Sequence, residues 1–146
     1  PIFFNFDIDS AEKALEYKNR YGVDGIMIGR AAIGYPWIFR EIKHFVQTGE
    51  HLAPPTIEER VAVAKKHLHK SVAWKGPLTG IYEMRRHYAN YLKGLPNIKE
   101  YRNRLVTLKL PDEINEVLDE IENEYTGFEI LKTPIELINY HEKCAV

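Results

Sequence analysis

Two apolar segments of this 146-residue sequence end in residues that could hold a ligand. Residues 1–8 and residues 23–28 are each predicted to form a strand, and Gly29 and Arg30 follow the second one. The second strand lacks strict alternation, which is typical of strands buried on both faces of a parallel sheet. Ligands of such proteins bind at the carboxyl ends of the strands, where backbone amides and an arginine favour phosphate. A turn glycine beside a surface arginine is the alternative interpretation.

Charge is segregated along the chain, and this predicts an anionic partner. Residues 1–59 hold 6 Lys/Arg and 9 Asp/Glu, residues 60–109 hold 12 and 2, and residues 110–146 hold 2 and 10. A block with ten excess positive charges repels itself unless it meets an anion. Nucleic acid is one such anion. The acidic residues of the C-terminal segment are the other.

A helix expected over residues 79–93 carries the densest part of this basic block. Arg86, Asn90 and Lys93 follow the spacing i, i+4, i+7 and are predicted to share one face, with Arg85 beside them. Arginines pair with phosphates, and neutralising several phosphates adds affinity through counterion release. Further cations of the basic block could extend the footprint: Lys65, Lys66, Lys70, Lys75, Arg102 and Arg104. Some of these are expected to be ordinary solvated side chains. Lys65 and Lys99 are expected to be ordinary solvated lysines, and Tyr88 and Tyr91 to be core residues rather than base-stacking ones.

The predicted elements change type near Pro54-Pro55, which marks a domain boundary. Before it, Asp9 is expected to cap a first helix and Pro36 to open a second, which gives a β-α-β-α unit. After it, only helices are expected, beginning near Thr56, Thr79, Asn97 and Pro111. The predicted fold class is mainly α with a short α/β part. The predicted domains are residues 1–53, residues 54–127 and a tail, residues 128–146, with a short helix over 134–141.

Several functional classes are disfavoured by composition. No stretch approaches the roughly 18 apolar residues of a spanning helix, so no membrane association is expected. The single cysteine, Cys144, excludes an intramolecular disulfide and favours a reducing, cytoplasmic location. The histidines form no cluster at metal-ligand spacing, so no metal site is expected. Because a strand-like run begins at Pro1, the chain is expected to be a fragment, and its exposed strand edges are expected to favour self-association.

Three stretches carry a resemblance to a known family. They are Asp7-Ile8-Asp9-Ser10, residues 22–39 (GVDGIMIGRAAIGYPWIF), and the pair of runs 83–88 (EMRRHY) and 91–96 (YLKGLP). The first two resemble the last two βα units of the bacterial tRNA-dihydrouridine synthases. The third resembles the helical tRNA-binding domain of that family.

The resemblance implies the C-terminal portion of an FMN-dependent enzyme built on a TIM (β/α)8 barrel. NADPH would reduce the flavin, which passes hydride to the C5–C6 bond of a uridine in tRNA. By the same resemblance, the residues that surround the FMN are Asn5, Phe6, Asp7, Gly29 and Arg30. The catalytic cysteine of the family belongs to an earlier part of the barrel and is not Cys144. The isolated chain therefore has no catalytic residue of its own and is expected to be inactive, although it could bind tRNA.

The chain departs from the family pattern at its first strand. Relatives usually read Gly-Asn-Gly-Asp where this chain has Phe4-Asn5-Phe6-Asp7. A phenyl ring on that loop is expected to hinder the approach of a phosphate, which glycine would permit. Either the sequence is altered at its start, or the chain holds flavin differently, or it holds none. Two alternative functions also stay open: a non-catalytic helical RNA-binding module, and another FMN-dependent barrel oxidoreductase that acts on a small metabolite.

Overall fold

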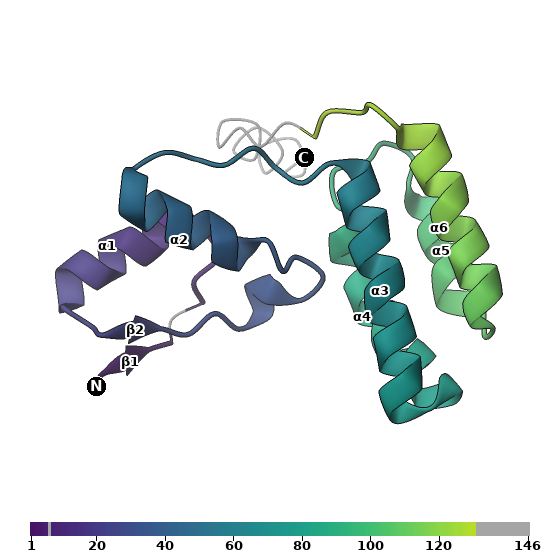
Figure 1. Ribbon diagram of the computed structural model, residues 1–146, viewed down its shortest axis with the longest axis horizontal. Coiled ribbons are helices and arrows are strands. Elements are labelled where there is room, and N and C mark those ends of the chain that lie inside the picture. Colours follow the sequence, from purple (N-terminus) through teal and green to yellow (C-terminus); the bar gives the residue numbers. More distant parts are fainter. Residues whose placement is uncertain (6, 131–146) are drawn as a thin grey trace, which may run out of the picture.

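The computed structural model describes residues 1–5 and 7–130 of a mainly helical chain (Figure 1). An α/β part, residues 3–48, holds a two-stranded parallel sheet and helices α1 and α2. A helical part, residues 57–125, holds α3 to α6. The prediction of a mainly α chain with a short α/β part is confirmed. Phe6, Cys144 and the tail helix expected over 134–141 lie outside the described residues.

The sheet is parallel, as the sequence predicted, but short. β1 (Phe3–Phe4) pairs with β2 (Gly25–Ile26), with Phe3 opposite Gly25. The strands predicted over 1–8 and 23–28 are thus two residues long each, because a backbone forms ladder bonds only where a neighbouring strand lies beside it. A Cβ at Gly25 would collide with the ring of Phe3, which would have to shift.

Helix α1 (Ala11–Tyr21) packs beside α2 (Ile38–Thr48), and both cover the sheet (Figure 1). The predicted cap Asp9 is wrong: Ser10 is the N-cap, and its hydroxyl accepts a bond of 3.2 Å from the Lys13 amide. Ser10 has the extended backbone that an N-cap needs, whereas Asp9 forms an ion pair with the Lys13 side chain. The small core beneath these helices contains Ile8, Ala11, Ala14, Ile38 and Ile42.

Helices α3 (Ile57–Lys75), α4 (Pro77–Tyr91), α5 (Lys99–Thr107) and α6 (Pro111–Tyr125) enclose a larger core. The capping box of Thr56 and Glu59 opens α3 as predicted, and Pro111 opens α6. Helix α5 begins after Ile98 rather than at Asn97, whose φ of 53° is left-handed and lies outside a helix.

Helix α4 differs from the predicted range 79–93 at both ends. It begins two residues earlier, because Pro77 fits the first turn of a helix, and it ends at Tyr91. Lys93 therefore lies in the following turn, beyond the helical face that it was predicted to share with Arg86 and Asn90. Tyr88 and Tyr91 are buried, which confirms them as core residues.

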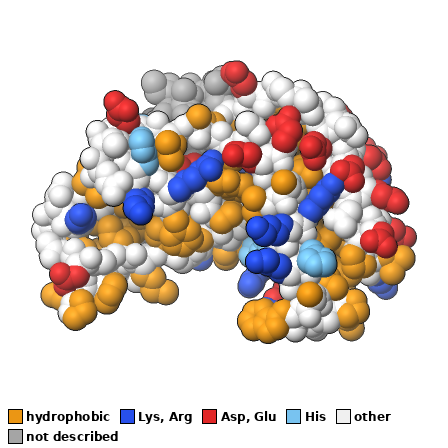
Figure 2. Space-filling view, in the orientation of Figure 1, with side chains coloured by type: hydrophobic (Ala, Val, Ile, Leu, Met, Phe, Trp, Pro, Cys, Tyr) orange, Lys and Arg blue, Asp and Glu red, His pale blue; other side chains and the backbone are white. Residues whose placement is uncertain are grey.

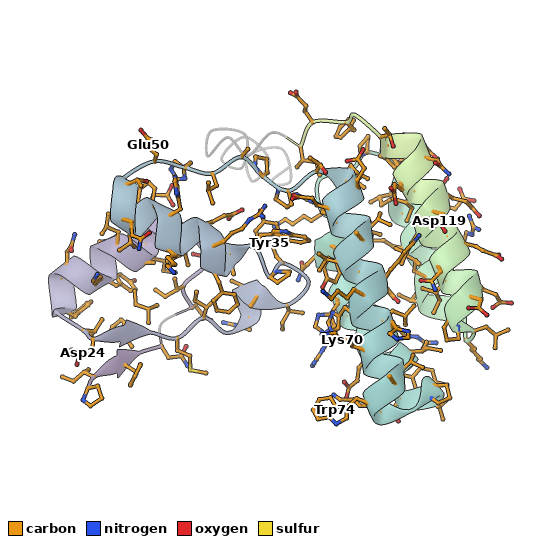
Figure 3. The ribbon with its side chains drawn as sticks, viewed as in Figure 1. Asp24, Tyr35, Glu50, Lys70, Trp74 and Asp119 are labelled. Carbon is orange, nitrogen blue, oxygen red and sulfur yellow. The ribbon has the colours of Figure 1, made fainter. Side chains whose placement is uncertain are left out.

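The two parts of the chain are joined by side chains that precede α2. Trp37 is 7% exposed and belongs to the core of the helical part, where its ring lies edge-on to that of Tyr91, 6.0 Å between centroids. Tyr35 contacts both cores and lies between the two parts in Figure 3. The α/β part is therefore seated on α3 and α4 rather than tethered by a linker alone.

Candidate functional site

Asp7 and Arg30, which follow the two strands and were predicted to bind FMN, form an ion pair. The Nε of Arg30 donates to Asp7 over 3.1 Å, and its Nη2 donates to the second carboxylate oxygen. Hydrogen bonding from Arg30, followed by its charge, lowers the pKa of the Asp7 carboxyl. Asp7 has a left-handed φ of 41°, and its carbonyl accepts a bond of 2.8 Å from the Lys13 ammonium.

The geometry at the strand ends leaves room and donors for an anion. The Arg30 side chain is 80% exposed, and two of its five N–H donors face Asp7, which leaves three. A Cβ added at Gly29 would meet nothing within 4 Å, so the space above this residue is open. Asn5 is exposed at the same end of the sheet. This donor set fits a phosphate.

The ring of Phe4 does not occupy that space. It stacks on Tyr21, 4.8 Å between centroids, and meets Tyr17 edge-on at 5.6 Å. Phe4 thus packs against α1, and the obstruction expected from this ring is wrong, because the ring lies against the helix. Phe6, the second departure from the family pattern, lies outside the described residues.

The loop that follows Arg30 is fixed on α4. It comprises the short 3-10 helix η1 (Arg30–Ala32) and residues 33–36. The amide of Asn90 donates to the Ile33 carbonyl over 2.6 Å. Gly34 has a φ of 68°, and a Cβ there would collide with the His87 carbonyl oxygen. Asn90, predicted to face tRNA, therefore has its amide directed at this loop.

Arg60 is a structural residue that the sequence analysis did not identify. It is 3% exposed and donates to the carbonyls of Tyr91, Lys93 and Pro55, over 3.4, 2.9 and 3.3 Å. Burial lowers the pKa of this guanidinium. Carbonyls at a helix end lack helical partners, so Arg60 stabilises the end of α4. In the sequence, Arg60 lies between Ile57 and Val61 on the apolar face of α3, and this position indicates a buried arginine.

A basic cleft of about 320 Å³ lies where the 30–36 loop meets α3 and α4. Its walls combine three loop residues with four residues of α3 and two of α4. They are Ala32, Gly34, Pro36, Val63, Lys66, His67, Lys70, His87 and Tyr91. Figure 2 shows Lys and Arg side chains gathered on this flank of the helical part and Asp and Glu side chains on the opposite flank.

Two histidines line this cleft in contact with each other. The rings of His67 and His87 lie 4.6 Å apart, and the hydroxyl of Tyr91 lies 3.1 Å from Nδ1 of His67. Burial, the neighbouring His67 and then Arg86 lower the pKa of His87 to about 4. Burial and then Arg86 also lower the pKa of His67. The surroundings thus keep both rings neutral, and Nδ1 of His87 is buried without a hydrogen-bond partner among the described residues.

Carboxylates neutralise some of the predicted tRNA-binding cations. Arg104 is held by both carboxylate oxygens of Glu120, one at 2.8 Å, and Lys75 pairs with Glu83. Lys65 pairs with Asp119, so its expected role as a solvated lysine is wrong, because α6 packs on α3 and brings this carboxylate to it.

The remaining predicted cations have no carboxylate within 4.0 Å in the described part of the chain. Lys70 and Lys93 are exposed, and Arg102 is half-buried. Arg85 lies over the ring of Tyr82, 4.4 Å from its centroid, and the Nε of Arg86 donates to His87 over 3.3 Å. Among the predicted tRNA-binding cations, those without a carboxylate partner in the described residues are therefore Lys66, Lys70, Arg85, Arg86, Lys93 and Arg102.

The described residues hold neither a cluster of metal-ligating side chains nor a membrane-spanning helix. Across residues 1–5 and 7–130, no three His, Cys, Asp or Glu side chains lie together in a group that could hold a metal ion. Within the same residues, none of the helices has the length and apolar character needed to cross a bilayer.

The fold thus joins an ion pair at the ends of two parallel strands to a basic helical surface through a loop that contacts α4. The family model "Dihydrouridine synthase (Dus)" matches residues 1–126. The chain therefore belongs to the dihydrouridine synthase family, and the resemblance found in the sequence is confirmed.

Curated relatives agree with this assignment. The chain is 45% identical over 109 residues to tRNA-dihydrouridine synthase B of Pseudomonas putida, covering 75% of this chain and 32% of that protein. It is 39% identical over 131 residues to tRNA-dihydrouridine synthase B of Pseudomonas aeruginosa, covering 87% and 40%. The match to tRNA-dihydrouridine synthase B of Shewanella oneidensis is 47% over 92 residues, covering 63% and 29%. The chain thus spans about a third of the length of these relatives.

The histidine pair predicts a loss of stability in mild acid. Because His87 binds a proton less readily in the folded chain than in the unfolded one, the unfolded chain takes up more protons between about pH 6.5 and about pH 4. The free energy of unfolding should therefore be highest above this window and should decrease as the pH is lowered through it. Urea unfolding across the window should give a shallower fall for His87→Gln than for the unaltered chain. His69→Gln, at an exposed histidine of α3, is the control, and equal slopes in all three proteins would contradict the account.

Proposed function

We propose that this chain is the C-terminal portion of an FMN-dependent tRNA-dihydrouridine synthase, which reduces the C5–C6 bond of uridine in tRNA with NADPH. The observation that carries the proposal is the fixed junction between Arg30, at the strand ends, and the basic cleft. Asn90 and Gly34 hold the 30–36 loop on α4, so the two sites keep one relative position. An enzyme that acts on a base within a large polyanion needs such an arrangement.

The α/β part is proposed to be the end of a (β/α)8 barrel, residues 1–53. A parallel pair with helices on it is one piece of such a fold. Ile2, Phe3 and Met27 are apolar and 66%, 71% and 55% exposed at or beside the strands. Further strands of the barrel would cover them, and without those strands these edges favour self-association of the chain. Residues 54–127 would form the tRNA-binding domain.

FMN would be held at the strand ends by Asn5, Phe6, Asp7, Gly29 and Arg30. The open space at Gly29 and the three remaining donors of Arg30 support a phosphate there. Asp7 would hold the guanidinium in place by its two hydrogen bonds. The flavin, when bound, supplies the hydride chemistry. The chain itself supplies binding and orientation, and the family's catalytic cysteine would come from an earlier part of the barrel.

The tRNA backbone would lie along the basic cleft and the adjoining surface of α4. The predicted contacts that have no carboxylate partner among the described residues are Lys66, Lys70, Arg85, Arg86, Lys93 and Arg102. Lys75, Arg104 and Asn90 were also predicted, and they would contribute less, since each already has a protein partner. Counterion release from the phosphates would supply the affinity.

A second function is favoured by one observation. Arg30 already has a carboxylate partner in Asp7, which a flavin phosphate would have to accommodate. A non-catalytic RNA-binding module would need no flavin and would keep this ion pair intact. Colourless protein that binds tRNA would support the module, and bound FMN would support the enzyme.

The tRNA surface predicts that Arg86→Ala weakens binding and flattens its salt dependence. Removing one phosphate contact should lower the slope of log K against log salt by about 1. Filter binding of tRNA at four or more salt concentrations measures this slope. Arg40→Ala removes the same charge, but from a guanidinium beside Glu59, and should leave the slope unchanged. An unaltered slope for Arg86→Ala would remove this residue from the surface.

The strand-end site predicts that Arg30→Ala lowers the affinity for FMN. One charge-assisted hydrogen bond contributes about 1.5–3 kcal/mol, so the dissociation constant should rise on the order of tenfold or more. Quenching of flavin fluorescence during titration measures it. Arg20→Ala, which removes an exposed arginine beside Glu16 on α1, is the control. Equal FMN affinity in both variants would contradict the placement of the phosphate.

A further inference from the structure

An indole ring stands exposed at the end of α3, next to the basic cleft. Trp74 is 84% exposed, whereas the other tryptophan, Trp37, is buried. Tryptophan is enriched at binding surfaces, where its large ring becomes buried, so an indole left in water is a candidate contact for a ligand. Neither core of the described residues includes Trp74.

Trp74 continues a row of cations along one face of its helix. Lys66, Lys70 and Trp74 are spaced i, i+4, i+8, and in Figure 3 Lys70 and Trp74 project from the same side of α3. Successive members of such a row lie about 6 Å apart along the helix axis. Lys66 and Lys70 line the basic cleft. The indole therefore stands one helical turn beyond the last lysine of the cleft.

One cation lies beside the indole, and the helices around it are basic. The ammonium of Lys75 lies 5.2 Å from the ring centroid of Trp74, and the guanidinium of Arg85 lies over Tyr82 on α4. From Arg60 to Tyr82 the sequence contains no Asp or Glu. Glu83, which pairs with Lys75, is the acidic residue nearest in sequence.

These observations distinguish between possible occupants. Leu78 and Tyr82 are also exposed, at 63% and 44%, so an apolar protein surface could in principle cover this end. A second copy of the chain would bring an identical cationic surface against this one, which like-charge repulsion disfavours. An unpaired nucleotide offers both a flat aromatic ring and an anionic phosphate, and stacking on an aromatic side chain beside cations is how single-stranded RNA is commonly held.

We propose that Trp74 is a stacking platform for an unpaired base of RNA whose backbone phosphates lie on Lys70 and Lys66. This inference rests on the proposed function and adds to it a specific subsite for single-stranded nucleotides. The base would stack on the indole, and Lys66 and Lys70 would supply the electrostatic attraction, because Lys75 already pairs with Glu83.

The test uses the two-tryptophan composition of the chain. In Trp37→Phe the tryptophan fluorescence comes from Trp74 alone. Titration with single-stranded oligo(U) of 12 nucleotides should quench it, and a 12-base-pair RNA duplex, whose bases are not free to stack, should quench it far less. Trp37 is a core residue, and replacing it alters the packing of the core. The quenching is therefore also measured in two proteins that keep Trp37, as the difference between the quenching of the unaltered chain and that of Trp74→Leu.

Affinity gives the second readout. Trp74→Leu should weaken oligo(U) binding on the order of tenfold, Trp74→Phe should retain most of it, and Leu78→Ala should leave it unchanged. Equal losses for Trp74→Leu and Leu78→Ala, or quenching that depends on protein concentration without RNA, would overturn the proposal in favour of an apolar protein contact. If RNA binding depends on salt but has the same affinity in all three variants, the stacking role of Trp74 is wrong and the proposed function still stands. No RNA binding by the unaltered chain would overturn both.

Discussion

The seating of the 30–36 loop on α4 is the constraint on which the functional account depends. A bond of 2.6 Å from Asn90 to Ile33 and the close approach of Gly34 to the His87 carbonyl fix this loop. Arg30 begins the loop, and Ala32, Gly34 and Pro36 line the basic cleft. Because protein interiors are close-packed, contacts of this kind hold the loop in a defined position relative to α4. The same loop therefore follows the strand ends and forms part of the wall of the basic cleft.

Intramolecular pairing divides the positive charge of the chain into two populations. On the side facing α6, Lys65 and Arg104 pair with Asp119 and Glu120, and Figure 3 labels Asp119 on α6. On the side facing the α/β part, Lys66 and Lys70 have no carboxylate within 4.0 Å among residues 1–5 and 7–130. The acidic helix thus neutralises one flank of the helical part and leaves the cleft flank for an external anion.

The sequence predicted the local structure well where one short-range signal decides it. The Thr56–Glu59 capping box, the Pro111 helix start and the burial of Tyr88 are all confirmed, since each depends on turn chemistry or on helical periodicity. It also predicted which segments are basic. It could not predict which cations would be paired, because Asp119 lies 54 residues from Lys65 and only the packing of α6 on α3 brings them together.

In the candidate site, too, the sequence predicted what local order decides and missed what long-range packing decides. The junction of Asp7 with Arg30 follows from parallel strand pairing, so residue order alone placed them at one edge. The role of Asn90 in the loop contact, the buried Arg60 and the exposed Trp74 were not predicted. Each depends on a long-range contact or on its absence: helical spacing shows which residues share a face but not what that face meets.

The most direct test of the central claim is a lysine-reactivity footprint of the chain with and without tRNA. Acetylation of each lysine, quantified by mass spectrometry, reports which ammonium groups the RNA covers. The account predicts strong protection of Lys66 and Lys70, which line the cleft, and little change at Lys65, which Asp119 already holds, or at Lys109. Protection of Lys109 with Lys66 and Lys70 unaffected would contradict the claim that the cleft flank meets the RNA backbone.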